Sequence, residues 1–243
     1  MERAAADVLT RRSIYAADVG ILYDLFSLHL TGAVDEAVDR AAGVYNVRIA
    51  GEGTNIANRI ESSGRLVNGR WTPGRTTAWF QIRGREARSE VVYDHARRTI
   101  DYHFRGETFF LRRLRVVDDT MTMPSGVHLD DVVSAMLNYA DGQWPPDGDG
   151  QLHTQVVRRR KKDDEDPDEV EAHGRAELVP FVLKLDRDTA SRKANGQFDM
   201  TPFSSWARRN RPAQIVFGEN RRPEMIKAPL ILGTSVVIRL RDP

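Results

Sequence analysis

The chain has 243 residues, of which 40% are hydrophobic and 29% are charged. These values lie in the ordinary globular range and exclude the disordered class. The 36 Lys and Arg residues against 35 Asp and Glu residues give a formal net charge of +1, so we expect no nucleic-acid partner. The chain has no cysteine, which excludes disulfides, thiol nucleophiles and thiolate metal sites.

The first 20 residues are predicted to form an N-terminal arm with a short helix over 4–12. Arg11 and Arg12 interrupt the apolar stretch that an export signal would need. No later stretch approaches the ~20 apolar residues of a membrane span, so no transmembrane segment is expected. As printed, the chain is expected to be either cytosolic or already without its signal.

From Ile21 onward, short β-type runs alternate with Gly, Asn, Asp and Pro. This spacing predicts one β-rich domain over 21–243, built as a meander of antiparallel strands. The predicted strands are Ile21–Thr31, Gly43–Gly51, Thr54–Leu66, Thr76–Ile82, Arg88–Tyr93, Thr99–Phe104, Glu107–Val117, Leu152–Arg159, Ala176–Leu185, Gly196–Thr201, Gln214–Phe217, Pro223–Ala228 and Thr234–Leu240.

The segment 88–104 predicts a hairpin, in which His95 to Arg98 make the turn. Pairing Asp94 with Thr99 puts Tyr93 opposite Ile100. The same register puts Val91 opposite Tyr102, so the apolar side chains share one face.

The helical spacing of apolar residues over 129–140 predicts the only helix of this β-rich domain. Asp130 and Asp131 are expected in its first turn, where the helix dipole favours negative charge. A single helix in a β protein is expected to cover or plug an open sheet. The predicted fold class is therefore mostly β, a strongly curved antiparallel sheet or an incomplete β-barrel or sandwich with one covering or plugging helix.

The segment 158–173 changes from a basic block to an acidic block. It is predicted to be an exposed charged insertion, because burying such a run would be costly. A basic clamp for phosphate or lipid head groups is the alternative, which the adjacent acidic residues oppose.

The sequence contains no recognisable catalytic motif, so we expect no catalytic residues, no cofactor and no enzyme activity. The six histidines lack the spacing of a metalloprotease site, and no metal site is predicted. A hydrolase whose site is assembled from distant strands remains an alternative.

Aromatic residues are concentrated in the central strands, where their rings could line an apolar cavity. Trp79, Tyr93, Tyr102 and Phe104 are the candidate ligand-binding residues. Ordinary core packing explains the same rings and is the simpler interpretation.

Several segments together resemble a bacterial family, the domain-of-unknown-function family numbered 3108. The resembling segments are 63–66, 71–73, 91–94, 129–137, 221–225 and 232–236. The resemblance implies an exported, β-rich envelope protein, similar to the half-barrel carriers of lipids and lipoproteins in the periplasm. It supplies no catalytic residues. The absence of an export signal and the charged insertion depart from the family pattern, so a cytoplasmic location stays open.

The leading hypothesis is a non-enzymatic, periplasmic or envelope-associated protein that binds a lipid or other amphiphile in a curved sheet. The alternative is a scaffold or assembly factor that presents an open sheet edge to an envelope protein. The sequence does not determine the ligand, the partner or the oligomeric state.

Overall fold

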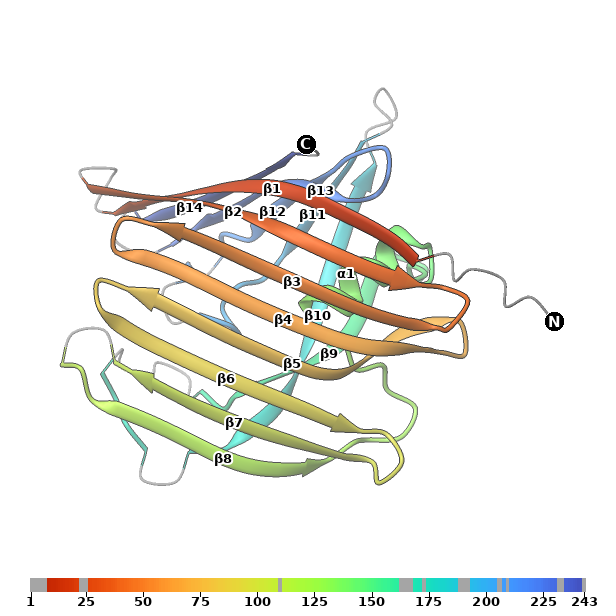
Figure 1. Ribbon diagram of the computed structural model, residues 1–243, viewed down its shortest axis with the longest axis horizontal. Coiled ribbons are helices and arrows are strands. Elements are labelled where there is room, and N and C mark those ends of the chain that lie inside the picture. Colours follow the sequence, from red (N-terminus) through yellow and green to blue (C-terminus); the bar gives the residue numbers. More distant parts are fainter. Residues whose placement is uncertain are drawn as a thin grey trace.

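The computed structural model describes residues 8–21, 26–108, 111–161, 168–171, 174–187, 193–204, 207–208, 210–230 and 234–241. These residues form one antiparallel sheet of 14 strands and one helix. The sheet curls into a nearly closed barrel around the helix (Figure 1). The expected fold class is confirmed.

The strands follow one another along the chain as neighbours, except that β1 pairs with β14. The sheet order is β8-β7-β6-β5-β4-β3-β2-β1-β14-β13-β12-β11-β10-β9. The elements are β1 (Val8–Ile21), β2 (Phe26–Asp39), β3 (Val44–Gly53), β4 (Ile56–Val67), β5 (Arg70–Ile82), β6 (Arg85–Asp94), β7 (Thr99–Glu107), β8 (Leu114–Thr122), α1 (Val132–Ala140), β9 (Gln151–Arg159), β10 (Ala176–Arg187), β11 (Ala194–Phe198), β12 (Ala213–Phe217), β13 (Pro223–Pro229) and β14 (Ser235–Arg241).

Loop segments contact both edges of the sheet. Val117 on the β8 edge forms a parallel bridge with Gly174. Gln155 on the β9 edge pairs with the segment before α1, accepting from the Asp130 N–H and donating to the His128 carbonyl. An unpaired edge is a template for pairing with another chain, and these contacts cover part of each edge.

The strands alternate between an inner face toward α1 and an outer face. On the inner face, Tyr15 lies across two glycines of the neighbouring strands and donates to Asn58 Oδ1 at 2.6 Å. A Cβ atom at Gly32 would lie 2.6 Å from the Tyr15 ring, and one at Gly51 would meet its hydroxyl. Glycine at both positions therefore lets the tyrosine ring lie flat against the wall of the barrel.

The helix α1 lies inside the barrel, and its buried residues pack against two different parts of the sheet. Val133 and Leu137 belong to the apolar cluster that includes Tyr45 and Trp71. On its other side, Tyr139 packs with residues of β9, β10 and β12. Within the described residues, no helix is long and apolar enough to cross a membrane.

Asp131 is the N-cap of α1, and no acidic residue lies in the first helical turn. The expectation that Asp130 and Asp131 occupy that turn is wrong. Asp131 instead accepts from the Ser134 N–H at 2.7 Å, while Ser134 Oγ accepts from the Asp131 N–H at 3.0 Å. This reciprocal capping box defines where the helix begins.

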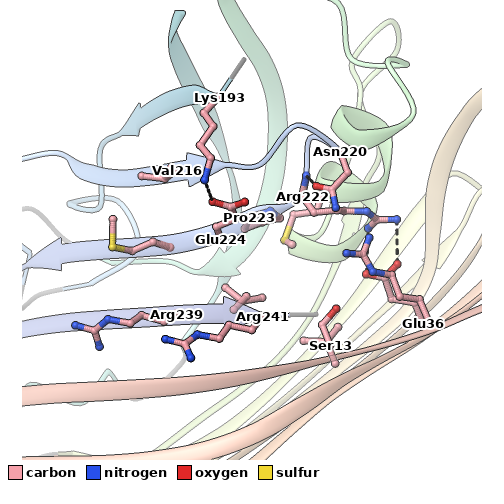
Figure 2. Close-up of a pocket in the computed structure, with 15 residues that line it drawn as sticks. Ser13, Glu36, Lys193, Val216, Asn220, Arg222, Pro223, Glu224, Arg239 and Arg241 are labelled. Carbon is pink, nitrogen blue, oxygen red and sulfur yellow. Dashed lines mark hydrogen bonds and ion pairs between the residues drawn. The ribbon is translucent and has the colours of Figure 1, made fainter. Parts of the chain in front are cut away.

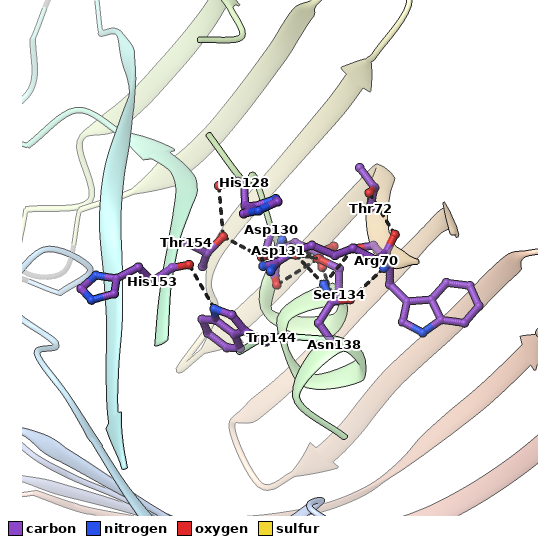
Figure 3. Close-up of polar contacts among 11 residues, drawn as sticks. Arg70, Thr72, His128, Asp130, Asp131, Ser134, Asn138, Trp144, His153 and Thr154 are labelled. Carbon is purple, nitrogen blue, oxygen red and sulfur yellow. Dashed lines mark hydrogen bonds and ion pairs between the residues drawn. The ribbon is translucent and has the colours of Figure 1, made fainter. Parts of the chain in front are cut away.

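A buried polar network ties the start of α1 to β4, β5 and β9, and Figure 3 shows its contacts with β5 and β9. Asp130 is fully buried, forms an ion pair with Arg70 of β5, and accepts from Thr154 of β9 at 2.6 Å. Asn138 closes the network by bonding both the N–H and the carbonyl of Trp71, at 2.7 and 2.8 Å. The Asp131 carboxylate accepts from Ser62 and Thr76 of β4 and β5. Both of these carboxylates are thereby hydrogen-bonded, as burial requires.

The predicted N-terminal arm is wrong from Val8 onward. Residues 8–21 form β1, which pairs with β2 from Val8 to Ile21 and with β14 from Ile14 to Gly20. Alanine and charged residues have low intrinsic strand preference, but hydrogen bonding on both sides outweighs that preference. Residues 1–7 lie outside the described residues.

The hairpin register is confirmed residue by residue, since Tyr93 pairs with Ile100, Val91 with Tyr102 and Asp94 with Thr99. Most other strands begin within three residues of the prediction, and three differ more. The predicted strand Ile21–Thr31 is β2, which begins at Phe26 and continues to Asp39. β8 begins at Leu114, seven residues after the predicted Glu107, and β5 begins at Arg70 rather than Thr76. In β5, the early residues continue the ladder past a bulge opposite Ser63 and Gly64.

The prediction that 158–173 forms an exposed charged insertion is partly wrong. Arg158 and Arg159 end β9, and Arg158 forms an ion pair with Glu177 of β10 at 2.5 Å. Asp168 is 7% exposed and accepts from the Leu111 N–H at 2.8 Å. The carboxylate accepts a hydrogen bond from a backbone donor at this buried position, as burial requires. Residues 162–167 and 172–173 lie outside the described residues.

We expect Asp130→Asn to lower the free energy of unfolding by about 3–5 kcal/mol, because Arg70 keeps its charge without a counter-ion in a buried position. Urea unfolding measures this change. Glu61→Gln is the control, since its pair with Arg48 has both side chains about half exposed, and should cost less than about 1 kcal/mol. Equal effects of the two substitutions would contradict the assigned role of the network.

Burial raises the pKa of four tyrosines, Tyr15, Tyr45, Tyr93 and Tyr102, above the ordinary value of 10.0. For Tyr102, burial raises the pKa to about 12. The fold therefore favours the neutral phenol, so its contribution to stability is complete below pH 10 and is lost as the pH rises through about 12. We expect alkaline unfolding in this window, together with tyrosine ionisation, in a combined circular dichroism and ultraviolet titration. If these tyrosines ionised with the ordinary pKa of 10.0 while the protein is still folded, that result would contradict their burial.

Candidate ligand-binding site

A cavity of about 610 Å³ opens in the barrel wall near the ends of β1, β13 and β14 (Figure 2). It opens because the ladder between β13 and β14 covers only Met225–Pro229 and Ser235–Arg239. Pro223 and Glu224 at the start of β13, and Leu240 and Arg241 at the end of β14, have no partner on the other strand in that ladder. The two strands therefore border a gap that leads to the inner face.

Apolar side chains supply part of the cavity wall. Val34 of β2 and Leu240 of β14 both pack in or against the cluster that surrounds α1. Met136 contributes from the helix, and its unbranched thioether adapts to irregular neighbours. An apolar segment of a ligand can be buried against these three residues.

An ion pair between Arg222 and Glu36 forms one side of the cavity (Figure 2). The groups are 3.0 Å apart, and their side chains are only 13% and 10% exposed. Burial lowers the pKa of the Arg222 guanidinium, with the neighbouring Arg11 acting in the same direction and Glu36 opposing both. An arginine nevertheless remains charged in a protein, so the pair places a fixed positive group at the cavity.

A second ion pair faces the first across the cavity, with Lys193 Nζ 2.6 Å from Glu224. Both of its side chains are about half exposed. Arg239 and Arg241 of β14 complete the lining, and Arg239 also pairs with Asp18 at 2.6 Å. The lining thus carries five cationic side chains against two carboxylates, although the whole chain has a net charge of +1. This excess favours an anionic ligand.

The four residues predicted to bind a ligand do not lie together. Tyr93 and Tyr102 are buried in an apolar cluster on the inner face of β6 and β7, and Phe104 packs against the same cluster. Trp79 of β5 projects from the opposite, outer face, because the inner face takes Thr76, which donates to Asp131. None of the four lines the cavity between β13 and β14.

Sequence reasoning missed the residues that do line this cavity. Glu36 and Arg222 are 186 positions apart, and no local pattern connects them. The pairing of β1 with β14 brings them together, and that pairing could not be inferred while residues 1–20 were taken as an arm. Met136 belongs to the predicted helix, but the sequence does not show which face of that helix lies at the gap between β13 and β14.

The described residues contain no group of three or more His, Asp or Glu side chains placed to hold a metal ion. Three histidines each form a pair with one aspartate, namely His29 with Asp18, His103 with Asp118 and His153 with Asp147. These pairs lie on separate parts of the barrel surface, and their side chains are about half exposed. This distribution gives no support to the hydrolase alternative.

Comparisons with known proteins found matches among solved structures. No protein-family model and no curated protein sequence matches the chain. A crystal structure of a beta-barrel-like protein of the domain of unknown function DUF1849 from Brucella abortus covers 98% of this chain and 98% of its own. The two are 10% identical, with a TM-score of 0.46. The resemblance to family 3108 is not confirmed by these comparisons.

We expect the two carboxylates of the cavity to differ sharply in their effect on stability. Glu36→Gln leaves the buried Arg222 without its counter-ion and should lower the free energy of unfolding by about 3 kcal/mol. Glu224→Gln removes a half-exposed partner and should cost less than about 1 kcal/mol. Urea unfolding at neutral pH checks both, and a Glu36→Gln variant as stable as the parent would contradict the buried pair.

Proposed function

We propose that the protein binds an anionic amphiphile, without catalysing a reaction, in the cavity between β13 and β14. The observation that carries the proposal is the composition of the wall. Val34, Met136 and Leu240 offer an apolar surface that leads inward, while the rim carries an excess of cationic groups. A ligand with a hydrocarbon tail and a negatively charged head matches both parts.

The magnitudes support an amphiphile over a simple anion. Each buried methylene contributes about 0.8 kcal/mol, so four methylenes add about 3 kcal/mol. Exposed charge pairs contribute about 1 kcal/mol or less each. The tail should therefore set most of the affinity, and the head should set the orientation. The cavity, at about 610 Å³, falls within the usual range for small-molecule sites.

An envelope location would supply such ligands, and it agrees with the resemblance to family 3108 that the sequence suggests. We therefore include a periplasmic or envelope-associated carrier in the proposal. The scaffold alternative has less support, because it depends on an open sheet edge. Val117 of β8 and Gln155 of β9 already bond to neighbouring segments of the chain.

The test is binding of alkyl phosphates to protein from which bound lipid has been extracted, followed by native mass spectrometry and titration calorimetry. We expect a one-to-one complex with dodecyl phosphate and weaker binding of octyl phosphate. The affinity should rise about fourfold for each added methylene that is buried, which is the equivalent of ~0.8 kcal/mol. Equal affinities for dodecyl phosphate and octyl phosphate would overturn the proposal, as would the absence of binding by either.

Met136→Trp should fill the cavity and reduce dodecyl phosphate binding at least tenfold. Val67→Trp is the matched control, because Val67 is 46% exposed at the end of β4 and does not line the cavity. Circular dichroism and urea unfolding establish that both variants remain folded. Unchanged binding in a folded Met136→Trp variant would place the ligand elsewhere.

A further inference from the structure

Tryptophan 79 has an unsatisfied hydrogen-bond donor. Its Nε1 atom is buried and has no hydrogen-bond acceptor among the described residues. The indole nitrogens of two other tryptophans are satisfied, since Trp71 donates to Asp141 at 2.9 Å and Trp144 to the His153 carbonyl at 3.0 Å. A buried donor without an acceptor lowers the stability of the fold by about 1–3 kcal/mol, so a ligand that supplies an acceptor would recover this free energy.

Arginines occupy the cross-strand neighbours of Trp79 on the outer face of the sheet. Arg59 of β4 and Arg88 of β6 pair directly with Trp79, and Arg105 of β7 pairs with Arg88. Directly opposed side chains have Cβ atoms about 5 Å apart. The four residues therefore form one row across four adjacent strands, which we call the Trp79 row.

Two of these arginines have no ion-pair partner among the described residues, namely Arg59 and Arg105. Arg88 has one, as it contacts Glu86 at 3.0 Å. The acidic residues of the adjacent row already have partners of their own. Glu61 lies 3.8 Å from Arg48, Glu90 lies 2.8 Å from Arg75, and Asp118 lies 2.7 Å from His103. Unbalanced positive charge thus collects at the Trp79 row.

The surface is hollowed at this row. Two depressions, of about 980 and 540 Å³, meet there, and Arg59 and Trp79 line both of them. The larger one includes the small side chains Ala33, Ala50 and Ala57 in its lining. Small residues between long arginines leave room for a ligand above the sheet.

We propose that the Trp79 row is a second binding site, for a compact oxyanion such as a phosphate or carboxylate group. On binding, the side chains that cover the Trp79 N–H move aside, so that one oxygen accepts from this N–H and the others accept from the guanidinium groups of Arg59 and Arg105 or Arg88. Guanidinium and indole N–H groups are donors only, so an oxyanion satisfies each of them. The site lies on the outer face and is separate from the cavity between β13 and β14.

The neighbouring acidic row favours a compact anion over a polyanion. Residues two positions apart on one strand are separated by about 7 Å, so Glu61 and Glu90 lie close to any chain of phosphates that crossed the strands at this point. A single oxyanion on the Trp79 row avoids those carboxylates. The expected near-neutral field of the whole chain, with a net charge of +1, also gives no long-range attraction for a polyanion.

The test is the indole N–H resonance of Trp79 in a nitrogen-15 NMR spectrum, assigned with Trp79→Phe. Sodium phosphate and sodium benzoate are titrated separately, with sodium chloride at matched ionic strength as reference. We expect a saturable shift of the Trp79 resonance with phosphate, with benzoate, or with both, and no saturable shift of the Trp71 and Trp144 resonances. The relative affinities distinguish a phosphate ligand from a carboxylate ligand.

The double substitution Arg59→Gln and Arg105→Gln should weaken binding at least tenfold. Arg97→Gln is the control, because Arg97 is an exposed arginine paired with Asp94 and lines neither depression, and it should leave binding within twofold. A Trp79 resonance that responds no differently from the chloride reference would overturn this proposal, as would an unchanged shift in the double variant. The shift is measured at Trp79, which does not line the cavity between β13 and β14. Either result therefore leaves the proposal for that cavity unaffected.

Discussion

The position of the helix depends on the buried ion pair between Arg70 and Asp130. Asp130 sits at 0% exposure inside the barrel, where an uncompensated carboxylate would be prohibitively costly. Arg70 supplies the opposite charge, while Ser134, Asn138 and Thr154 contribute hydrogen bonds. A pair of this kind is weak evidence for stability in itself, but it requires a specific arrangement. It thereby fixes the start of α1 relative to β5 and β9.

The helix position in turn shapes the cavity. With α1 anchored at its N-terminus by this network and near its C-terminus by Asp141, which pairs with Arg40 at 2.8 Å, Met136 is held at the gap between β13 and β14. The remaining interior is occupied by three apolar clusters. The barrel is therefore largely filled by its own side chains, and the open volume lies where the β13–β14 ladder ends.

The sequence predicted most of the fold where local patterns were sufficient. The register of the 88–104 hairpin followed from alternation alone. The apolar spacing over 129–140 predicted the helix, which is observed as α1 at Val132–Ala140. The errors occurred where distant pairing overrode local preference. Residues 8–21 contain Ala and Arg residues that favour a helix, yet β1 is a strand because β2 and β14 bond to it on both sides. The candidate site was missed for the same reason, since Glu36 and Arg222 meet only after β1 joins β14.

The most direct measurement for the central claim is a crystal structure of the protein grown with dodecyl phosphate. We expect the alkyl chain to contact Val34, Met136 and Leu240, with the phosphate among the cationic side chains at the end of β14. Density for the alkyl chain at any other place, or an unoccupied cavity at saturating ligand, would contradict it.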